Sequence, residues 1–316
     1  MFANNIDEQI APASITKVIT ALVVLDYYDI SDSITISLPD NYQYNGKVAY
    51  LESGKQISIE DLLEFLLIYS ANDAAYVGAI ASTGTVESFV AEMNNKAKSL
   101  GMKNTTLLNP DGLDQQGHTT TLRDLLTMSL RFIDNFRLLS ITSKNSFSSD
   151  ISGKDKIYYS TNEIIDEGFI GIKTGWTSTA GLTFIGLNLE NERQILTIVN
   201  RSTVDEKKIT HFLDTQLLYE NSFKHFGIYE SFSNDTEVYK VNNPLKSYVV
   251  NANQTWKDFV DLRKLVNINL IDYEDGRLKY INNTSDTEVK VSESNYKVVW
   301  DFNLLEIFST FANWNY

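Results

Sequence analysis

Ser14 and Lys17 are the first residues along the chain whose types and spacing could do chemistry. They lie three positions apart in APASITKVITA, residues 11–21, and side chains three positions apart share one face of a helix. The apolar residues that follow at helical spacing indicate a buried helix, where a lysine loses its proton more easily and becomes a base beside a hydroxyl nucleophile. Ser-x-x-Lys is a common pattern, and Ser294 with Lys297 also matches it, so other parts of the chain must decide.

Two more motifs carry polar side chains of the required kinds. YSAND contains Ser70 and Asn72 directly after an apolar stretch, and GIKTGWT contains Lys173, Thr174 and Gly175 in a segment with strand alternation. Ser-x-Asn recurs elsewhere and is weak by itself, whereas Lys-Thr-Gly occurs once. Taken alone, the lysine of the last motif also fits an edge strand before a turn.

The composition excludes several functional classes. The 316 residues, 43% hydrophobic and 22% charged, allow one large or two moderate globular domains. A net charge of −14 argues against a nucleic-acid partner. The chain has no cysteine, its three histidines lack a metal-binding spacing, and no apolar run has the length of a membrane span. We therefore predict no metal and no cofactor.

Helices are predicted to fill the segment between the first motif and the last. Ser58 and Asp61 are typical of a helix N-terminus and open an apolar stretch that runs to Tyr69. Further helices are predicted from Asp73, over Thr85 to Leu100 before a closing Gly101, and over Leu122 to Phe136.

From Gly168 the apolar pattern changes to a period of two. GFIGIKTGWTSTAGLTFIGLNLENERQILTIVNR predicts two or three adjacent antiparallel strands with a turn near Asn191 and Glu192. A helix is predicted from Asp205 to Phe226. A helical block between the Ser14 helix and a late antiparallel sheet predicts an α+β fold in which helices flank the sheet.

The composition shifts again near residue 231. Short β-rich runs separated by polar turns such as EDG and NNTSD predict a small all-β domain over residues 231–300, after a first domain at 1–230. Residues 301–316 contain FNLLEIFSTFANWNY, which puts its large apolar side chains on one helical face. Two interpretations stay open for this amphipathic segment: a peripheral membrane contact, or packing against the β-domain.

Together, in this order and on these elements, the three motifs resemble those of the penicillin-recognising serine acyltransferases. PASITKVITALVVLD, DLLEFLLIYSANDAA, FVAEMNNKAKSLGMKNTTLLNPDGL and GFIGIKTGWTSTAGLTFIGL are similar to the low-molecular-mass D-alanyl-D-alanine carboxypeptidases, and the likeness runs over residues 2–228. The resemblance implies a β-lactamase/transpeptidase-like catalytic domain with an inserted helical subdomain. It also implies a serine-type D-Ala-D-Ala carboxypeptidase that acts without a cofactor.

The resemblance assigns roles to the residues of the first two motifs. Ser14 would attack the carbonyl between the two D-alanines of a peptidoglycan stem peptide, and Lys17 would take its proton. Burial and the nearby cation of Lys173 would lower the pKa of Lys17. Ser70 would pass the proton to the departing D-alanine, and Asn72 would orient Lys17 and the substrate amide.

The last motif would bind and polarise the substrate. By the resemblance, Lys173 and Thr174 hold the terminal carboxylate, and Gly175 keeps the strand edge clear for a close backbone approach. The backbone N–H groups of Ser14 and Trp176 would form the oxyanion hole. Penicillin and other β-lactams would acylate Ser14 as covalent inhibitors.

Two features depart from the family pattern. Ala71 stands where the family's middle motif usually has glycine, and the segment before Ser14, MFANNIDEQIAPA, matches only the end of what precedes the nucleophile in the family. We therefore expect the first strand of the family's sheet to be missing from residues 1–230. MFANNIDEQI has no export-signal pattern, so a location at the outer face of a bacterial plasma membrane is an implication of the family alone.

Two other functions remain as alternatives. A class A β-lactamase would carry an E-x-x-x-N segment between the second and third motifs, and none occurs between Asn72 and Lys173. A truncated, non-catalytic peptidoglycan- or penicillin-binding protein would keep the motifs without turnover. Release of D-alanine from a D-Ala-D-Ala peptide separates that alternative from the enzyme.

Overall fold

The computed structural model describes residues 3–151, 155–190, 193–204, 206–207 and 209–232, and beyond them the backbone of the strands β9 to β15. Side chains are described as far as residue 225. The chain divides into two compact units, Phe2–Asn221 and Ser222–Tyr316. Each unit has its own secondary structure, and the three motifs all fall in the first.

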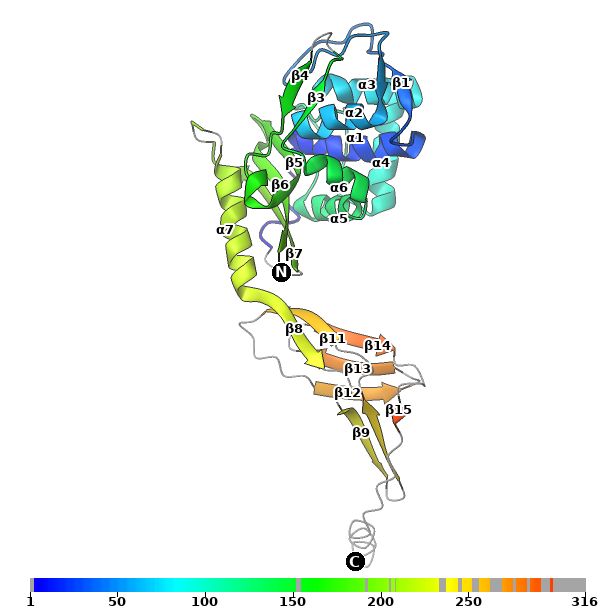
Figure 1. Ribbon diagram of the computed structural model, residues 1–316, viewed down its shortest axis with the longest axis vertical. Helices are drawn as coiled ribbons and strands as arrows, with labels where there is room; N and C mark the ends of the chain where they lie inside the picture. The colour runs from blue at the N-terminus through cyan, green and yellow to red at the C-terminus, as the bar shows by residue number, and fades with distance from the viewer. Residues whose placement is uncertain are drawn as a thin grey trace, which may run out of the picture. The chain divides into compact units, whose positions relative to one another are not determined.

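The first unit combines a helical block with an antiparallel sheet (Figure 1). Its helical elements, in chain order, are η1 (Ala13–Ile15), α1 (Thr16–Tyr27), α2 (Ile59–Glu64), η2 (Phe65–Tyr69), α3 (Asn72–Thr83), α4 (Val86–Leu100), α5 (Leu122–Ile133), α6 (Phe136–Thr142), η3 (Ile165–Glu167) and α7 (Thr210–His225). Its strands are β1 (Ser33–Thr35), β2 (Gln56–Ser58), β3 (Ser146–Ser149), β4 (Lys156–Tyr159), β5 (Phe169–Thr177), β6 (Gly181–Glu190) and β7 (Arg193–Ser202).

The helix α1 lies at the centre of the helical block. Every residue from Thr16 to Val24 is buried, as expected for a helix that is apolar on all sides and enclosed by neighbours. It packs against α3, α4, α5 and η2. A lysine at the second position of such a helix is necessarily removed from water, and Lys17 occupies that position.

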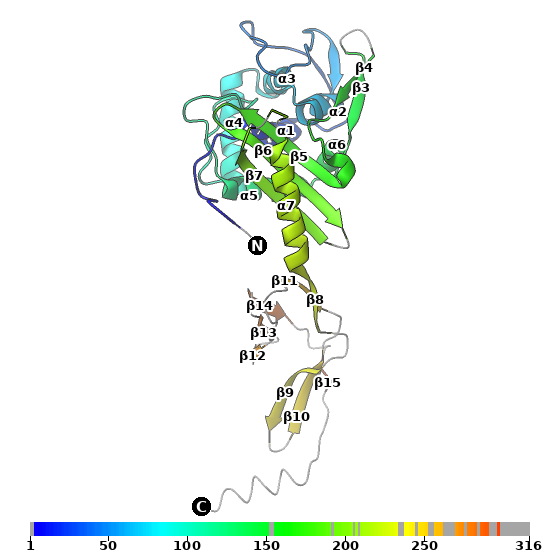
Figure 2. The ribbon, with the colours of Figure 1, turned by 90° about the vertical axis from the view of Figure 1, so that its left-hand side faces the viewer.

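The strands β5, β6 and β7 form one antiparallel sheet with β6 in the middle. Figure 2 shows α7 over one face of this sheet and α1 behind the other. Phe184 packs with Phe212 of α7 on the first face, whereas Ile172 and Ile185 belong to the core shared with the helical block. The sheet is buried between two helical layers, which confirms the predicted α+β class.

Local signals placed most helix ends correctly. The hydroxyl of Ser58 accepts the Asp61 N–H at 3.0 Å, and α4 runs from its cap at Thr85 to Gly101, whose φ is 87°. The helix predicted over Leu122 to Phe136 is α5, which ends at Ile133, whereas α6, which Asn135 caps, was not predicted. The last helix begins at Thr210, later than predicted.

The second unit is described as strands. They are β8 (Phe226–Phe232), β9 (Glu237–Asn243), β10 (Lys246–Asn251), β11 (Trp256–Asp261), β12 (Asn269–Glu274), β13 (Arg277–Asn282), β14 (Ser285–Lys290) and β15 (Tyr296–Lys297), and all their pairings are antiparallel. The domain boundaries at 230 and 300 stay predictions. The amphipathic segment 301–316 lies outside the described residues. Within the part of the chain that is described, no helix has both the length and the apolarity needed to cross a membrane.

Candidate active site

Ser14 lies in η1, the 3-10 turn that leads into α1. The residue before it, Ala13, has a φ of 49°, in the left-handed region that residues with a side chain rarely adopt. Gly112 packs directly behind this turn: a Cβ at Gly112 would stand 1.9 Å from the carbonyl oxygen of Ala13. Backbone strain that the surrounding structure holds in place is typical of functional sites. The loop that contains Gly112 therefore fixes how Ser14 is presented.

Lys17 is fully buried, and its amine contacts three oxygen atoms. Nζ lies 3.0 Å from the hydroxyl of Ser14, 2.7 Å from Oδ1 of Asn72 and 2.6 Å from the main-chain carbonyl of Asp111. These partners come from three separate segments of the chain, so the amine has little freedom to move. A neutral Nζ in this position can take the proton of the Ser14 hydroxyl directly.

The two lysines of the site both have lowered pKa values. Burial lowers the pKa of Lys17 from 10.5 to about 8, and the negative charges of Asp111 and Asp73 oppose this shift. Burial, and then repulsion from Lys17 and Lys47, lowers the pKa of Lys173 well below 10.5. The lowered pKa expected for Lys17 is therefore caused mainly by burial, and not by the charge of Lys173. The repulsion between the two lysines lowers the pKa of Lys173 instead.

Ser70 and Asn72 lie where η2 ends and α3 begins. The π-helical turn η2 finishes at Ser70, which is 6% exposed and left-handed with a φ of 70°. Asn72 opens α3, and its Nδ2 donates to the carbonyl of Asn45 at 2.7 Å while its Oδ1 accepts from Lys17. Ala71 has an ordinary φ of −66°, so the backbone at this position does not require the family's glycine.

The Lys-Thr-Gly segment lies on β5, beside the nucleophile. Lys173 is buried, and its Nζ donates to the carbonyl of Thr174 at 3.1 Å. A Cβ at Gly175 would lie 3.2 Å from that of Ala13 and 3.4 Å from the nitrogen of Ser14, closer than ordinary packing. The glycine therefore lets β5 approach the Ser14 turn. Trp176 follows with its side chain 48% exposed.

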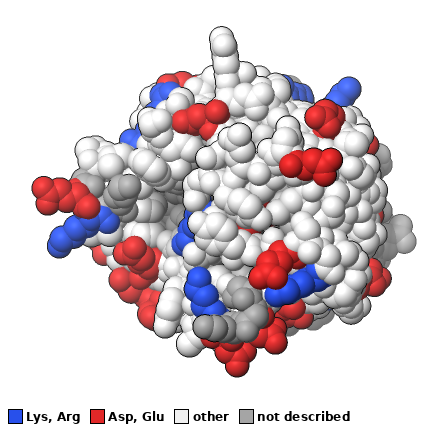
Figure 3. Space-filling view, turned by 90° about the horizontal axis from the view of Figure 1, so that it is seen from above, with Lys and Arg blue, Asp and Glu red and all other residues white. Residues whose placement is uncertain are grey.

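The structure brings most of the predicted site residues into one place. Ser14, Lys17 and Asn72 form one hydrogen-bonded group, and β5 carries Lys173 and its two neighbours to its edge. Ser70 lies at the same turn as Asn72 but, among the described residues, makes no side-chain hydrogen bond to this group. Figure 3 shows one face of the molecule, on which acidic and basic side chains are scattered around a recess with basic side chains at its edge.

Sequence reasoning missed several residues that hold this group together. The carbonyls of Asp111 and Asn45 fix Lys17 and Asn72. On β5, the Thr174 hydroxyl donates to the Thr161 hydroxyl at 2.6 Å. For the Asp111 carbonyl, the only indication in the sequence was that Asp111 lies in NPDGL, part of a segment similar to the family. Main-chain acceptors leave no mark in residue type, so the other contacts could not be found without the fold.

The loop 109–118 is anchored by His118, for which the sequence indicated no metal spacing. Its Nδ1 accepts the N–H of Leu108 at 3.0 Å, and its Nε2 lies 2.9 Å from the hydroxyl of Thr16 in α1. Burial lowers the pKa of His118 to about 4, so at neutral pH the ring is uncharged and Nε2 carries the proton donated to Thr16. His118 is therefore a structural residue.

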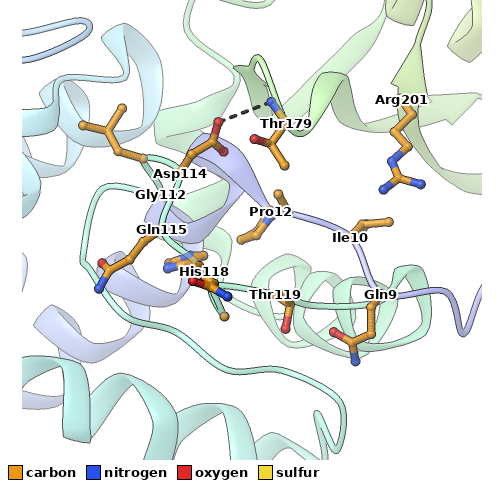
Figure 4. A pocket seen from close by; sticks show the side chains of 14 residues that line it. Gln9, Ile10, Pro12, Gly112, Asp114, Gln115, His118, Thr119, Thr179 and Arg201 are labelled. Atoms are coloured by element: carbon orange, nitrogen blue, oxygen red, sulfur yellow. Dashed lines mark hydrogen bonds between the residues drawn. The ribbon is translucent and has the colours of Figure 1, made fainter.

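Asp114 ties the same loop to the turn between β5 and β6. Its Oδ1 accepts from the hydroxyl of Thr177 at 2.7 Å, and its Oδ2 accepts from the N–H of Thr179 at 3.2 Å. Figure 4 shows the second bond beside a cavity of about 350 Å³ that also includes Gln9 and Arg201. These two bonds hold the loop 109–118 and the end of β5 in fixed positions relative to each other.

Comparison with known proteins shows the family of the chain. Residues 1–203 match peptidase family S11, described as D-alanyl-D-alanine carboxypeptidase. The chain belongs to this family. It is 32% identical over 228 residues to D-alanyl-D-alanine carboxypeptidase DacF of Bacillus subtilis, which covers 68% of this chain and 58% of the relative. The chain thus spans less than two thirds of the length of the curated relatives that it matches first.

Solved structures agree with the family. Penicillin-binding protein D2 of Listeria monocytogenes, in a cefotaxime-bound form, is 30% identical with a TM-score of 0.61, over 70% of this chain and 91% of that one. A peptidoglycan synthesis regulatory factor (PBP3) of Streptococcus pneumoniae is 21% identical with a TM-score of 0.74, over 92% of this chain and 93% of that one. At that identity the likeness is one of fold.

Proposed function

We propose that the protein is a serine-type D-Ala-D-Ala carboxypeptidase that removes the terminal D-alanine from peptidoglycan stem peptides through an acyl-enzyme on Ser14. One observation carries the proposal: the buried Nζ of Lys17, with a pKa of about 8, lies 3.0 Å from the Ser14 hydroxyl. A nucleophile beside a base that is itself oriented by a third group is the arrangement that acyl transfer requires. Here the orienting group is Asn72, 2.7 Å from Nζ.

Acylation would begin when neutral Lys17 takes the Ser14 proton. Oγ then attacks the carbonyl between the two D-alanines, and the N–H groups of Ser14 and Trp176 stabilise the oxyanion; losing one such donor typically costs ~10²–10³ in rate. The proton passes through Ser70 to the nitrogen of the departing D-alanine as the C–N bond breaks. Water then attacks the ester, releases the shortened peptide and restores the Ser14 hydroxyl.

Lys173 and Thr174 would hold the terminal carboxylate of the substrate. The two lysines of the site repel each other, and among the groups that shift the pKa of Lys173 there is no anion. A bound carboxylate supplies that missing negative charge and stabilises the protonated form. With the carboxylate bound, the Thr174 hydroxyl would donate its one proton to the carboxylate and would accept from the Thr161 hydroxyl, to which it donates in this structure. This pairing favours substrates that end in a free carboxylate.

The proposal extends to inhibitors and location. A β-lactam carries both an activated carbonyl and a carboxylate, so it would acylate Ser14 by the same steps and leave it slowly. Action on peptidoglycan places the enzyme outside the cytoplasm, at the outer face of the bacterial plasma membrane, and we propose that residues 301–316 make peripheral contact there. The relatives named as carboxypeptidases and the cefotaxime-bound neighbour support the activity.

Release of D-alanine tests the proposed function. The purified chain is incubated with a diacetyl-L-lysyl-D-Ala-D-Ala peptide, and free D-alanine is measured with time. We expect steady release that Ser14→Ala abolishes. Binding of β-lactam without release of D-alanine would instead favour the non-catalytic alternative, and rapid turnover of the β-lactam would favour a β-lactamase.

A further inference from the structure

Lys47 is a third lysine at the edge of the active site, and the mechanism described above does not use it. Its main-chain carbonyl accepts the N–H of Asn72 at 2.7 Å. Two residues further on, the buried carboxylate of Asp73 accepts the N–H groups of Ala49 and Leu51, each at 2.9 Å. The start of α3 therefore fixes the main chain of this segment beside the second motif.

The amine of Lys47 lies over the ring of Tyr69. Its Nζ is 4.3 Å from the ring centroid, and a tyrosine ring attracts an ammonium group through its electron-rich face. Tyr69 is the last residue of η2, directly before Ser70, and it packs edge-on against Tyr158 with 5.0 Å between centroids. The side chain of Lys47 is exposed, so a ligand can reach it, and the ring of Tyr69 gives it a preferred direction.

The same corner is joined to the strand that carries the third motif. The carbonyl of Ile68, next to Tyr69, accepts the N–H of Thr161 at 3.1 Å, and the hydroxyl of Thr161 accepts from that of Thr174 at 2.6 Å. The turn η2 also packs against β5. Lys47 is close enough to Lys173 for its charge to lower the pKa of Lys173. Two ammonium groups from different elements thus approach one corner of the site.

Neither of these two lysines has an acidic partner. Among the described residues, Lys55, Lys96 and Lys144 form ion pairs with carboxylates, whereas no ion pair includes Lys47 or Lys173. The chain has a net charge of −14, so acidic side chains are in excess elsewhere. Two neighbouring cations without an anion repel each other, and a bound anion would relieve that repulsion. The pair is therefore suited to an anionic group of a ligand.

From this placement we propose that Lys47 is a second cationic ligand of the substrate's terminal carboxylate, beside Lys173 and Thr174, and that it determines specificity for a free C-terminus. The inference rests on the proposed function, which places the terminal carboxylate at Lys173. A carboxylate has two acceptor oxygens, so one can accept from the residues of β5 while the other accepts from Lys47. Amidation of the C-terminus removes the negative charge that both lysines would bind.

Lys47→Met tests this role, because methionine keeps an unbranched side chain against Tyr69 and removes the charge. With diacetyl-L-lysyl-D-Ala-D-Ala as substrate, we expect kcat/KM to fall about threefold to tenfold, through a higher KM with little change in kcat. Lys47→Arg keeps a cation that pairs well with carboxylates and should keep most of the wild-type value. The matched control is Lys55→Met, which removes the same charge from a lysine that pairs with Glu52 at 3.0 Å; it should keep the wild-type kcat/KM.

Binding to Ser14→Ala separates contact with the carboxylate from a structural effect. Isothermal titration calorimetry of this variant, with and without Lys47→Met, is done with the free peptide and with its C-terminal amide. Lys47→Met should weaken binding of the free acid about threefold to tenfold and leave binding of the amide unchanged, and Lys47→Arg should restore binding of the acid. An equal loss for both peptides, or no loss for either, would overturn the inference.

The inference and the proposed function fail in different ways. If the protein binds the peptide but releases no D-alanine, the proposed function is wrong, and the calorimetric comparison of acid and amide still decides about Lys47. If D-alanine is released and Lys47→Met leaves kcat/KM unchanged, the carboxypeptidase remains and the role of Lys47 is wrong. A Ser14→Ala variant that binds neither peptide also overturns the inference.

Discussion

The pH dependence of acylation follows from the environment of Lys17. Only the neutral amine can accept the Ser14 proton, and its pKa is about 8. At pH 7 about one molecule in eleven carries the neutral form, and the base is about 300-fold more abundant than for a lysine with a pKa of 10.5. The second-order rate constant for acylation by benzylpenicillin should therefore rise about tenfold between pH 7 and pH 9. Quenched samples analysed by intact-protein mass spectrometry give this rate constant at each pH.

Asp111→Asn provides a sharper form of the same test. The negative charge of Asp111 raises the pKa of Lys17, whereas its Oδ1 accepts from the N–H of Leu113, a bond that asparagine can keep. Removal of the charge should lower the pKa of Lys17, so the variant should reach its acylation plateau at a lower pH than the wild type. A rate constant that is flat from pH 6 to pH 9, or a midpoint that Asp111→Asn moves upward, would refute the role of Lys17 as the base.

Three further predictions concern the framework of the site. Gly112→Ala should abolish acylation and lower the free energy of unfolding by ~3 kcal/mol or more, because the new Cβ would clash with the main chain of Ala13. The control is Gly101→Ala, which has a similar φ but open space around the new Cβ. Thermal unfolding should show that this control loses about 1 kcal/mol. The pKa of Lys17 is lower in the folded state, so the unfolded chain binds more protons than the folded chain between pH 8 and 10.5. The wild-type free energy of unfolding, measured in urea and compared with that of Lys17→Met, should therefore rise across this pH range by up to about 3 kcal/mol. Thr161→Val removes the partner of the Thr174 hydroxyl, and steady-state kinetics should show KM for a D-Ala-D-Ala peptide raised about fivefold with kcat little changed.

Much of the framework could be predicted from local signals. The capping serine at residue 58, the glycine after α4 and the period-two alternation of β5 to β7 all depend on neighbouring residues, so the sequence shows them directly. The short helix α6 was not predicted, since the helix predicted from Leu122 ended at Phe136, where α6 begins. The cap at Asn135 is a local signal that could have revealed its N-terminus.

The site divides in the same way. The three motifs indicated which side chains belong to the site, and the family resemblance indicated their roles. The contacts that hold these side chains in place, however, join segments that are far apart in the chain. The Asp111 carbonyl lies 94 residues from Lys17, and the Asn45 carbonyl lies 27 residues from Asn72. The requirement for glycine at position 112 is of the same kind, since it depends on how closely a distant loop approaches the Ser14 turn.

The central claim is that Ser14 is an activated nucleophile, and intact-protein mass after incubation with benzylpenicillin tests it most directly. The wild type should gain the mass of one penicilloyl group, peptide mapping should place it on Ser14, and Ser14→Ala should gain none. Wild-type protein that is folded by circular dichroism and gains no mass, or a Ser14→Ala variant that still gains it, would contradict the account.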